Sequence, residues 1–234
     1  MDRAPTRIGK AYKGLAMEGM IARWYARSTA RDMSAFEAEA AGIAARLHPG
    51  ADVLEVAPGP GYLAIALAKR GDFRIVGLDV SRAFVRIAAE NARAAGVAID
   101  FRLGDAAAMP LPSNAFDFLV CRAAFKNFAN PVRALSEMHR VLRPGGEALI
   151  IDMRKDASNA AIDEAVAAMN ARGLNAFVIR AVFKLSLRKR AYSRNEFIGM
   201  AKATPFGGAE IGEAPLGFEV RLRKARALGT IAAA

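Results

Sequence analysis

The chain has 234 residues, of which 53% are hydrophobic and 24% charged, so one globular domain with a sizeable core suffices and no second domain is needed. Cys121 is the only cysteine, which excludes an internal disulfide and a cysteine-based metal cluster, and no run of about 18 apolar residues or leader-like opening is present, so we expect a cytoplasmic, unanchored protein. The net charge of +11 favours acidic partners, namely nucleic acid, an anionic membrane surface or a negatively charged small substrate, and does not choose among them.

The first predicted element is an amphipathic helix near residues 17–25. Arg23, Arg27 and Arg31 are available for one face, and apolar side chains recur at helical spacing for the other. Packing of the apolar face on the core is the simplest interpretation. Residues 35–47 predict a second helix, ended by His48-Pro49-Gly50. The recurring apolar residues are Met17, Met20, Ile21, Trp24 and Tyr25.

The next feature is a short apolar run, residues 53–56, that leads into the sequence Ala57-Pro58-Gly59-Pro60-Gly61. This pattern predicts a buried strand that turns sharply into a helix. Glycine tolerates positive φ and close approach of a ligand, and the first amides of the helix point toward an anionic group. A phosphate-binding P-loop would need Gly-Lys-Ser/Thr, whereas Gly61 is followed by Tyr62 and Leu63. A dinucleotide fold would place its third glycine at Ala64.

Further apolar runs follow at regular intervals. The run 74–79 ends in Asp79, 24 residues after Glu55, where an acid can accept both hydroxyls of a ribose. The alternation of strands with helices near 61–70, 81–95 and 131–141 predicts five parallel strands with helices on both faces of the sheet. Ligands of such sheets bind outside the carboxyl ends of the strands. Four polar or small residues fall there: Ala57, Asp79, Asp105 and Cys121.

The last third of the chain predicts helices and then a hairpin. In the segment 177–192, Arg180, Lys184 and Arg188 recur at i, i+4 and i+8, which gives the helix a basic stripe. The residues 209–212 and 218–222 predict two further strands. The apolar stripe of the helix would consist of Ile179, Val182, Phe183 and Leu187.

Residues 50–153 resemble a class I S-adenosylmethionine-dependent methyltransferase, and the run from Asp105 to Asp152 is similar to the ubiquinone/menaquinone-biosynthesis group of small-molecule methyltransferases. The Leu-Arg-Pro-Gly-Gly turn at 142–146 and the segment 105–112 carry this similarity. The resemblance implies a Rossmann-like, doubly wound, mostly parallel seven-stranded sheet with an antiparallel C-terminal hairpin strand and helices on both faces. The expected single domain, 1–234, comprises an N-terminal helical lid (1–48), a cofactor-binding core (50–153), a helical cap insertion (157–192) and a C-terminal helix and hairpin (194–234).

The resemblance also implies roles for individual residues. Asp79 would hold the ribose diol, Asp105 and the Ala106 amide would meet the adenine, and Glu55 would order the glycine turn. Ala57 stands where the family usually has its first glycine, which costs roughly 1 kcal/mol or more if the position needs a positive φ. The full set expected to contact the cofactor is Glu55, Ala57, Pro58, Gly59, Gly61, Asp79, Val80, Asp105, Ala106, Met109, Cys121 and Tyr25; the residues expected toward the acceptor are Trp24, Phe125, Lys126 and Asp152.

We therefore expect methyl transfer from S-adenosylmethionine, with S-adenosylhomocysteine as product, to a carbon or oxygen of a small molecule that is anionic or prenylated. In-line displacement mainly requires alignment and exclusion of water, so no metal is expected and a base is optional. Cys121 as a buried packing residue or a thiolate nucleophile, and Lys126 as an acid-binding or a surface lysine, are alternatives that stay open. Three further alternatives also stay open, namely an RNA methyltransferase, a non-catalytic cofactor-binding protein and peripheral contact with a membrane. Dispersed basic residues do not favour nucleic acid as the partner. Candidate bases are Asp152, Tyr25, Tyr192 and Glu18.

Overall fold

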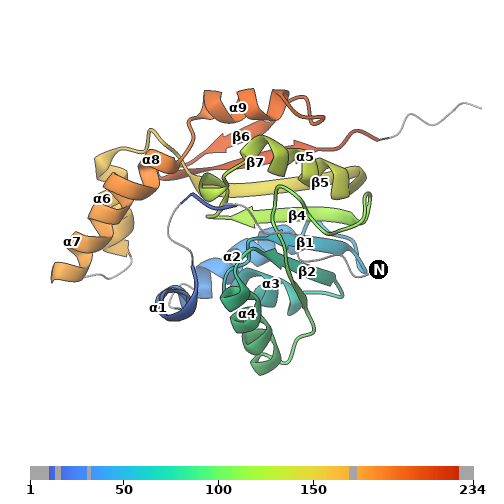
Figure 1. The fold of residues 1–234 in the computed structure, drawn as a ribbon, viewed down its shortest axis with the longest axis horizontal. Coiled ribbons are helices and arrows are strands. Elements are labelled where there is room, and N and C mark those ends of the chain that lie inside the picture. Colours follow the sequence, from blue (N-terminus) through green and yellow to red (C-terminus); the bar gives the residue numbers. More distant parts are fainter. Residues whose placement is uncertain (1–10, 14–16, 31–32, 169–172, 227–234) are drawn as a thin grey trace, which may run out of the picture.

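The computed structural model describes residues 11–13, 17–30, 33–168 and 173–226, and its centre is a seven-stranded sheet (Figure 1). The strand order is β3-β2-β1-β4-β5-β7-β6. The first five strands are mutually parallel, and β7 runs antiparallel to both of its neighbours, β5 and β6. The predicted fold class is confirmed. The strands are β1 (Asp52–Val56), β2 (Arg74–Asp79), β3 (Asp100–Leu103), β4 (Phe116–Arg122), β5 (Leu142–Met153), β6 (Glu210–Glu213) and β7 (Gly217–Arg223).

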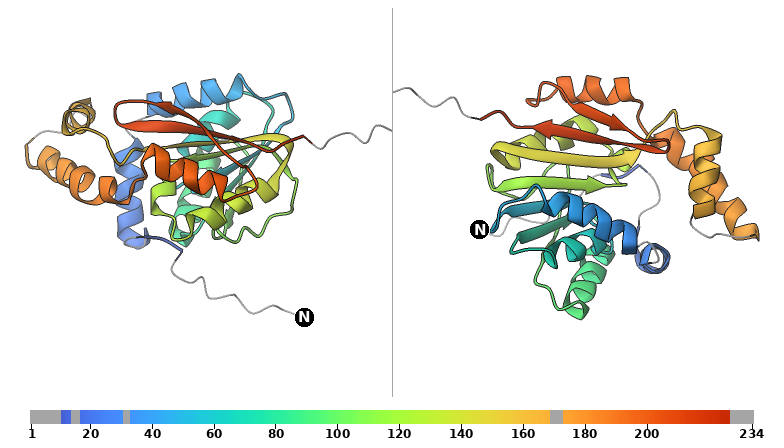
Figure 2. Two further views of the ribbon diagram at one scale, coloured as in Figure 1. Left: turned by 90° about the horizontal axis from the view of Figure 1, so that it is seen from above. Right: turned by 180° about the vertical axis from the view of Figure 1, so that it is seen from behind.

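Helices cover both faces of this sheet, as the view from above in Figure 2 shows. On one face α2 packs on α3, and side chains such as Val53 and Ile75 meet them. On the other face α5 and α9 enclose the larger apolar cluster, which includes Leu54 and Leu119. The main helices are α1 (Gly19–Thr29), α2 (Met33–Ala44), α3 (Tyr62–Ala68), α4 (Arg82–Ala94), α5 (Pro131–Val141), α6 (Asn159–Ala168), α7 (Gly173–Ala181) and α9 (Arg194–Lys202).

Local sequence signals explain where several helices begin. The Ser81 hydroxyl accepts a hydrogen bond from the Phe84 amide at 3.1 Å and so caps α4. Ser193 and Glu196 form a reciprocal capping box at the start of α9. Pro131 occupies the first turn of α5, where its missing N–H costs no helical hydrogen bond. These caps fix where α4, α5 and α9 begin.

The Pro-Gly-Gly segment differs from its prediction as a turn. Strand β5 already begins at Leu142, which pairs with Phe116, and the pairing shifts register before Glu147 pairs with Phe118. Gly145 takes a φ of +86°, so the segment is an irregular, bulged part of the strand. Backbone hydrogen bonds to Lys224 hold it against the chain that follows β7.

The predicted apolar stripe of the cap is only partly correct. Helix α7 continues through a π-helical segment, η3 (Val182–Leu187), into the short α8 (Arg188–Arg190). Ile179, Phe183 and Leu187 pack against a small core beneath them, but Val182 is 45% exposed. Val182 lies where α7 passes into this π-helical segment, and its side chain faces outward there.

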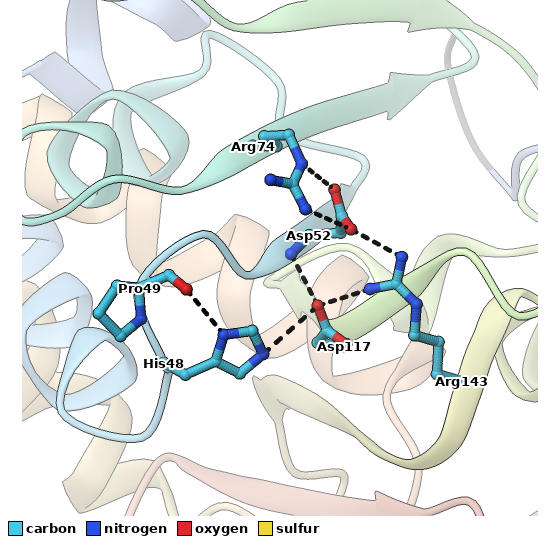
Figure 3. A network of polar contacts seen from close by, with 6 residues as sticks. All are labelled: His48, Pro49, Asp52, Arg74, Asp117 and Arg143. Atoms are coloured by element: carbon cyan, nitrogen blue, oxygen red, sulfur yellow. Dashed lines mark hydrogen bonds and ion pairs between the residues drawn. The ribbon is translucent and has the colours of Figure 1, made fainter.

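Ion pairs between side chains join the amino ends of neighbouring strands, as Figure 3 shows. The Arg143 guanidinium bridges Asp52 of β1 and Asp117 of β4 at 2.7 and 2.6 Å, and Arg74 of β2 donates to Asp52. The Arg74 hydrogen bond is the main cause of lowering the pKa of Asp52 to about 2. His48 is exposed and lies 3.7 Å from Asp117, consistent with a loop residue. This edge is therefore a structural clamp.

Candidate functional site

The turn between β1 and α3 stands at the carboxyl edge of the sheet and has a left-handed backbone at three positions. Ala57, Gly59 and Gly61 have φ values of +58°, +55° and +81°. A Cβ on Gly61 would lie 2.9 Å from the Phe101 ring and 3.0 Å from Ala88, so only glycine fits there. Ala57 adopts the conformation that an alanine resists, at a cost of about 1–2 kcal/mol. The turn is thus held in a strained shape by its surroundings.

Asp79 at the end of β2 is one of the groups that hold this turn. Its Oδ2 accepts a hydrogen bond from the Gly59 amide at 3.1 Å, and its Oδ1 accepts one from the Ser81 amide at 2.8 Å. Burial raises the pKa of Asp79 to about 6, although these amides favour the ionised form. A carboxylate has about four acceptor positions, and the Val80 amide also donates to Asp79, so the ionised group retains capacity for a further donor of a ligand.

Glu55 lies below the same turn and is 3% exposed. Desolvation raises the pKa of Glu55 to about 8, while a backbone hydrogen bond from Ala64 in α3 lowers it. Its Oε2 is buried without a hydrogen-bond partner among the described residues. Burial thus favours the protonated form of Glu55, and its bond to Ala64 connects the end of β1 with the helix after the turn.

The residues expected near an adenine follow β2 and β3. The Asp105 Oδ1 accepts from the Ala107 amide at 2.9 Å, which shapes the turn that presents Ala106. Val80 is half-buried beside Asp79. Met109 is 5% exposed within the main apolar core. Asp105, Ala106 and Val80 therefore lie at the strand ends, whereas the Met109 side chain packs inward.

The segment before and including α1 is fastened over the strand ends. The Glu18 carboxylate accepts from the amides of Arg82 and Ala83 at 3.0 and 3.1 Å, and so caps α4; as a candidate base it is already engaged. Tyr25 stacks edge-on against Phe84, and one of its ring carbons lies 4.0 Å from the position of a Cβ on Gly59. Tyr25 thus adjoins the glycine turn.

Trp24 lies on the other side of α1 and is 66% exposed. The helix buries Ala22 and Ala26 instead of its large apolar residues. The prediction that the apolar stripe of this helix packs on the core is therefore wrong for Met20, Ile21 and Trp24. The small alanine side chains let α1 pack closely on the protein, and the large apolar side chains remain exposed on its other side.

The end of β4 differs most from its prediction. Phe125, expected to face an acceptor, is fully buried among other aromatic rings. Lys126 is neither a surface lysine nor free for an acid, because its Nζ donates to the Asp152 Oδ1 at 2.7 Å and both side chains are buried. Cys121 is 0% exposed, and burial raises the pKa of its thiol well above the usual value, which makes a thiolate nucleophile untenable.

A polar cluster that the sequence did not reveal lies beside these residues. Residues 11–13 pair with the segment after β4, through a bridge between Tyr12 and Phe128. The Lys13 Nζ donates to the Tyr192 hydroxyl at 2.7 Å, and Arg190 donates to the Lys13 carbonyl at 2.7 Å. Burial raises the pKa of Tyr12, while Arg190 beside it lowers the pKa. No local sequence pattern marks Tyr12 or Lys13, because their partners come from the far end of the chain.

These groups offer hydrogen-bond donors and acceptors of the kind that a nucleoside needs. The donors and acceptors at the carboxyl edge are backbone amides, the Asp79 and Asp105 carboxylates and a cationic cluster formed by Lys13 and Arg190. Among the residues the structure describes, no group of three or more His, Cys, Asp or Glu side chains could hold a metal ion. No helix of the described part is long and apolar enough to cross a membrane.

Comparison with known sequences identifies a matching family and several relatives. Residues 54–150 match the family described as "Methyltransferase domain". A demethylmenaquinone methyltransferase of Deinococcus radiodurans is 38% identical over 120 residues, which are 51% of this chain and 50% of that protein. A 2-phytyl-1,4-naphtoquinone methyltransferase of Synechococcus elongatus is 35% identical over 114 residues, 47% of this chain and 49% of that protein. The chain thus aligns with about half the length of these curated relatives.

Solved structures share the fold over most of the chain. A putative S-adenosyl-L-methionine-dependent methyltransferase of Methanococcus maripaludis superposes with a TM-score of 0.75 at 23% identity, covering 94% of this chain and all of that one. The [4+2]-cyclase SpnF superposes with a TM-score of 0.52 at 21% identity, covering 95% of this chain and 89% of that one. At these identities the likeness concerns the fold, which hosts more than one chemistry.

Proposed function

Because residues 54–150 match the methyltransferase-domain family, we propose that this chain transfers the methyl group of S-adenosylmethionine to a small-molecule acceptor through a carbon or oxygen nucleophile. The observation that carries the proposal is the hydrogen bond between Asp79 and the Gly59 amide. It joins the acid after β2 to the turn after β1, at the edge where sheets of this type bind nucleosides. A cytoplasmic location stays a prediction.

Named residues would divide the binding of the cofactor between them. Asp79 would accept the ribose hydroxyls, Asp105 and the Ala106 amide would meet the adenine, and the Gly59 region would pass the methionyl chain. S-adenosylmethionine supplies an electrophilic methyl group on a sulfonium, so the protein needs to align the acceptor and exclude water. Tyr25, which adjoins Gly59, supports the idea that α1 serves as a lid over this turn.

A quinone-type phenol is the acceptor class that we favour. The two relatives named above act, by their names, on demethylmenaquinone and on a phytyl naphthoquinone. A reduced quinone becomes nucleophilic at carbon or oxygen when its phenol loses a proton, and nearby cations favour the resulting anion. Lys13 and Arg190 are cations at this edge, and the Tyr192 hydroxyl, held by Lys13, is the candidate to orient the phenol. Among the other candidate bases, Asp152 and Glu18 are already engaged.

The two alternatives lack comparable support. An RNA methyltransferase rests on the net charge alone. A non-catalytic nucleoside-binding protein would retain the Asp79 site and show no turnover. The same experiment separates these possibilities from the proposed reaction.

The test is calorimetric titration with S-adenosylmethionine and S-adenosylhomocysteine, followed by methyl transfer to reduced naphthoquinones and simple phenols. We expect micromolar binding that weakens at least tenfold in Asp79→Ala, and turnover of a reduced naphthoquinone. A folded wild-type protein that binds neither compound would refute the cofactor assignment. Binding without turnover on any phenol would refute the reaction, and salt-sensitive, tight RNA binding would favour the RNA alternative.

A further inference from the structure

Large apolar side chains are exposed on two helical elements at one end of the molecule. In all three views of Figures 1 and 2, α1 and the helix formed by α7, η3 and α8 lie at the same end. Both elements border the candidate site, because Tyr25 of α1 adjoins the glycine turn and Arg190 of α8 donates to the Lys13 carbonyl. We call the exposed set the apolar rim; its exposed fractions are Met20 85%, Ile21 45%, Trp24 66%, Phe177 67%, Val182 45% and Leu185 65%.

The rim is not a by-product of poor packing, because each element has a second face that is covered. Helix α1 buries Ala22 and Ala26. In the cap, Ala176, Ile179 and Phe183 contact the small core that includes Ile162. Both helices therefore have a covered side toward the protein and a large-residue side toward the outside, which is the arrangement of helices that lie in a membrane interface.

The charge on the two helical elements of the rim is basic, although Glu18 directly before α1 and Glu164 of α6 are exposed acids nearby. The sequences of α1 (19–29) and of the helix 173–190 contain no aspartate or glutamate. Arg23, Arg27 and Lys189 are exposed on them. Asp163 of α6 offsets part of the charge, since it pairs with Arg180 and Lys184 at about 3 Å. Among the described residues, Arg23, Arg27 and Lys189 have no acidic partner. An apolar rim bordered by such cations is complementary to an anionic lipid surface, on which each basic residue contributes about 1 kcal/mol.

We propose that the apolar rim docks on the surface of an anionic lipid bilayer, with Trp24 and the cap residues at the level of the lipid headgroups. Tryptophan prefers this level because its ring is apolar and its N–H is polar. The inference goes beyond the proposed methyl transfer, and it provides a route by which a lipophilic acceptor reaches the site without crossing water. A second copy of the chain fits this surface less well, since a symmetric contact would bring like charges together.

The single tryptophan of the chain makes the proposal directly measurable. Trp24 emission would be recorded as vesicles of phosphatidylcholine, with or without phosphatidylglycerol, are added to the full chain. We expect a blue shift, quenching by lipids brominated on the acyl chains, and at least tenfold stronger binding to the anionic vesicles. Unchanged emission with both vesicle types, or vesicle binding without quenching, would overturn the proposal.

A matched pair of variants tests the location of the contact. Arg23→Ala/Arg27→Ala removes two charges beside the rim, and Lys69→Ala/Arg70→Ala removes two exposed charges after α3, at the opposite edge of the sheet. We expect about thirtyfold weaker vesicle binding for the first and less than threefold for the second. Leu185→Ser, at an exposed position, should weaken binding and retain the fold. Equal losses of vesicle binding in the two double variants would contradict the proposal. So would sedimentation at micromolar concentration that shows a dimer formed through the rim.

The failure of this inference is distinguishable from failure of the proposed function. Vesicle binding requires no turnover, and each variant would also be titrated with S-adenosylhomocysteine. Intact cofactor binding without vesicle binding refutes only the docking surface. Vesicle binding without cofactor binding refutes only the nucleoside site.

Discussion

The Lys126 ammonium and the Asp152 carboxylate form a buried ion pair at the end of β4, with 2.7 Å between Nζ and Oδ1. The same carboxylate accepts from the backbone amides of Lys126 and Met153, at 2.8 and 2.7 Å. Lys126 also donates to the carbonyl of Ala123, whose φ is +55°. One ion pair thus fixes a left-handed residue and the start of the loop after β4, beside the expected position of methyl transfer.

Replacing one partner of this pair should be costly. We expect Lys126→Met to lower the free energy of unfolding by about 3–5 kcal/mol, because it leaves the Asp152 charge buried without a cation. The double variant Lys126→Met/Asp152→Asn should lose less than the single one. Urea denaturation of the two variants measures the difference, and additive losses would show that the two side chains do not act as a pair.

Ala57 offers a change that should stabilise the protein. Ala57→Gly relieves the positive φ, partly offset by the larger entropy of the unfolded glycine, so we expect a gain of about 0.5–1 kcal/mol. S-adenosylhomocysteine binding should be retained. The control is Ala89→Gly within α4, which should cost about 1 kcal/mol. A destabilised Ala57→Gly would mean that the Cβ contacts outweigh the backbone strain.

Replacement of Asp79 should have opposite effects on the stability of the fold and on the binding of S-adenosylmethionine. The pKa of Asp79 is raised from 3.8 to about 6, so the folded state holds this proton more tightly than the unfolded state. The stability linked to protonated Asp79 is complete below pH 3.8 and is lost as the pH rises through 6. At pH 7.5, Asp79→Asn should therefore raise the free energy of unfolding, by about 1–3 kcal/mol, and weaken S-adenosylmethionine binding at least tenfold. Wild-type affinity should fall as the pH is lowered through 6. Equal stability of both proteins across pH 4–8 would contradict the shift.

Glu55 should control the stability at higher pH. Because burial raises its pKa from 4.5 to about 8, the stability linked to its protonated form is complete below pH 4.5 and lost by pH 8. Between pH 6 and 8, where Asp79 has largely titrated, wild type should lose about 2–3 kcal/mol, and Glu55→Gln should have a flatter profile. Parallel urea midpoints of the two proteins over this range would show that Glu55 is already ionised.

The sequence determined the parts of this protein that depend on neighbouring residues. Alternating apolar runs and helices predicted the doubly wound sheet, which is confirmed. Asp79 could be placed at a strand end because it closes an apolar run, and Glu55 because it lies one residue before the end of its run. The glycine turn was recognisable from its spacing, although the sign of the φ at Ala57 was not.

Only the tertiary structure decided which surfaces are covered. Periodicity shows which residues share a face, but not whether that face meets a partner. The predicted burial of Trp24 and Val182 is therefore wrong, and the sequence does not distinguish a surface role from a buried one for Lys126. The Tyr12–Phe128 bridge and the Lys13–Tyr192 hydrogen bond join segments that are far apart in the chain. The burial of a charge and the shift of its pKa follow from such distant contacts, which no local pattern encodes.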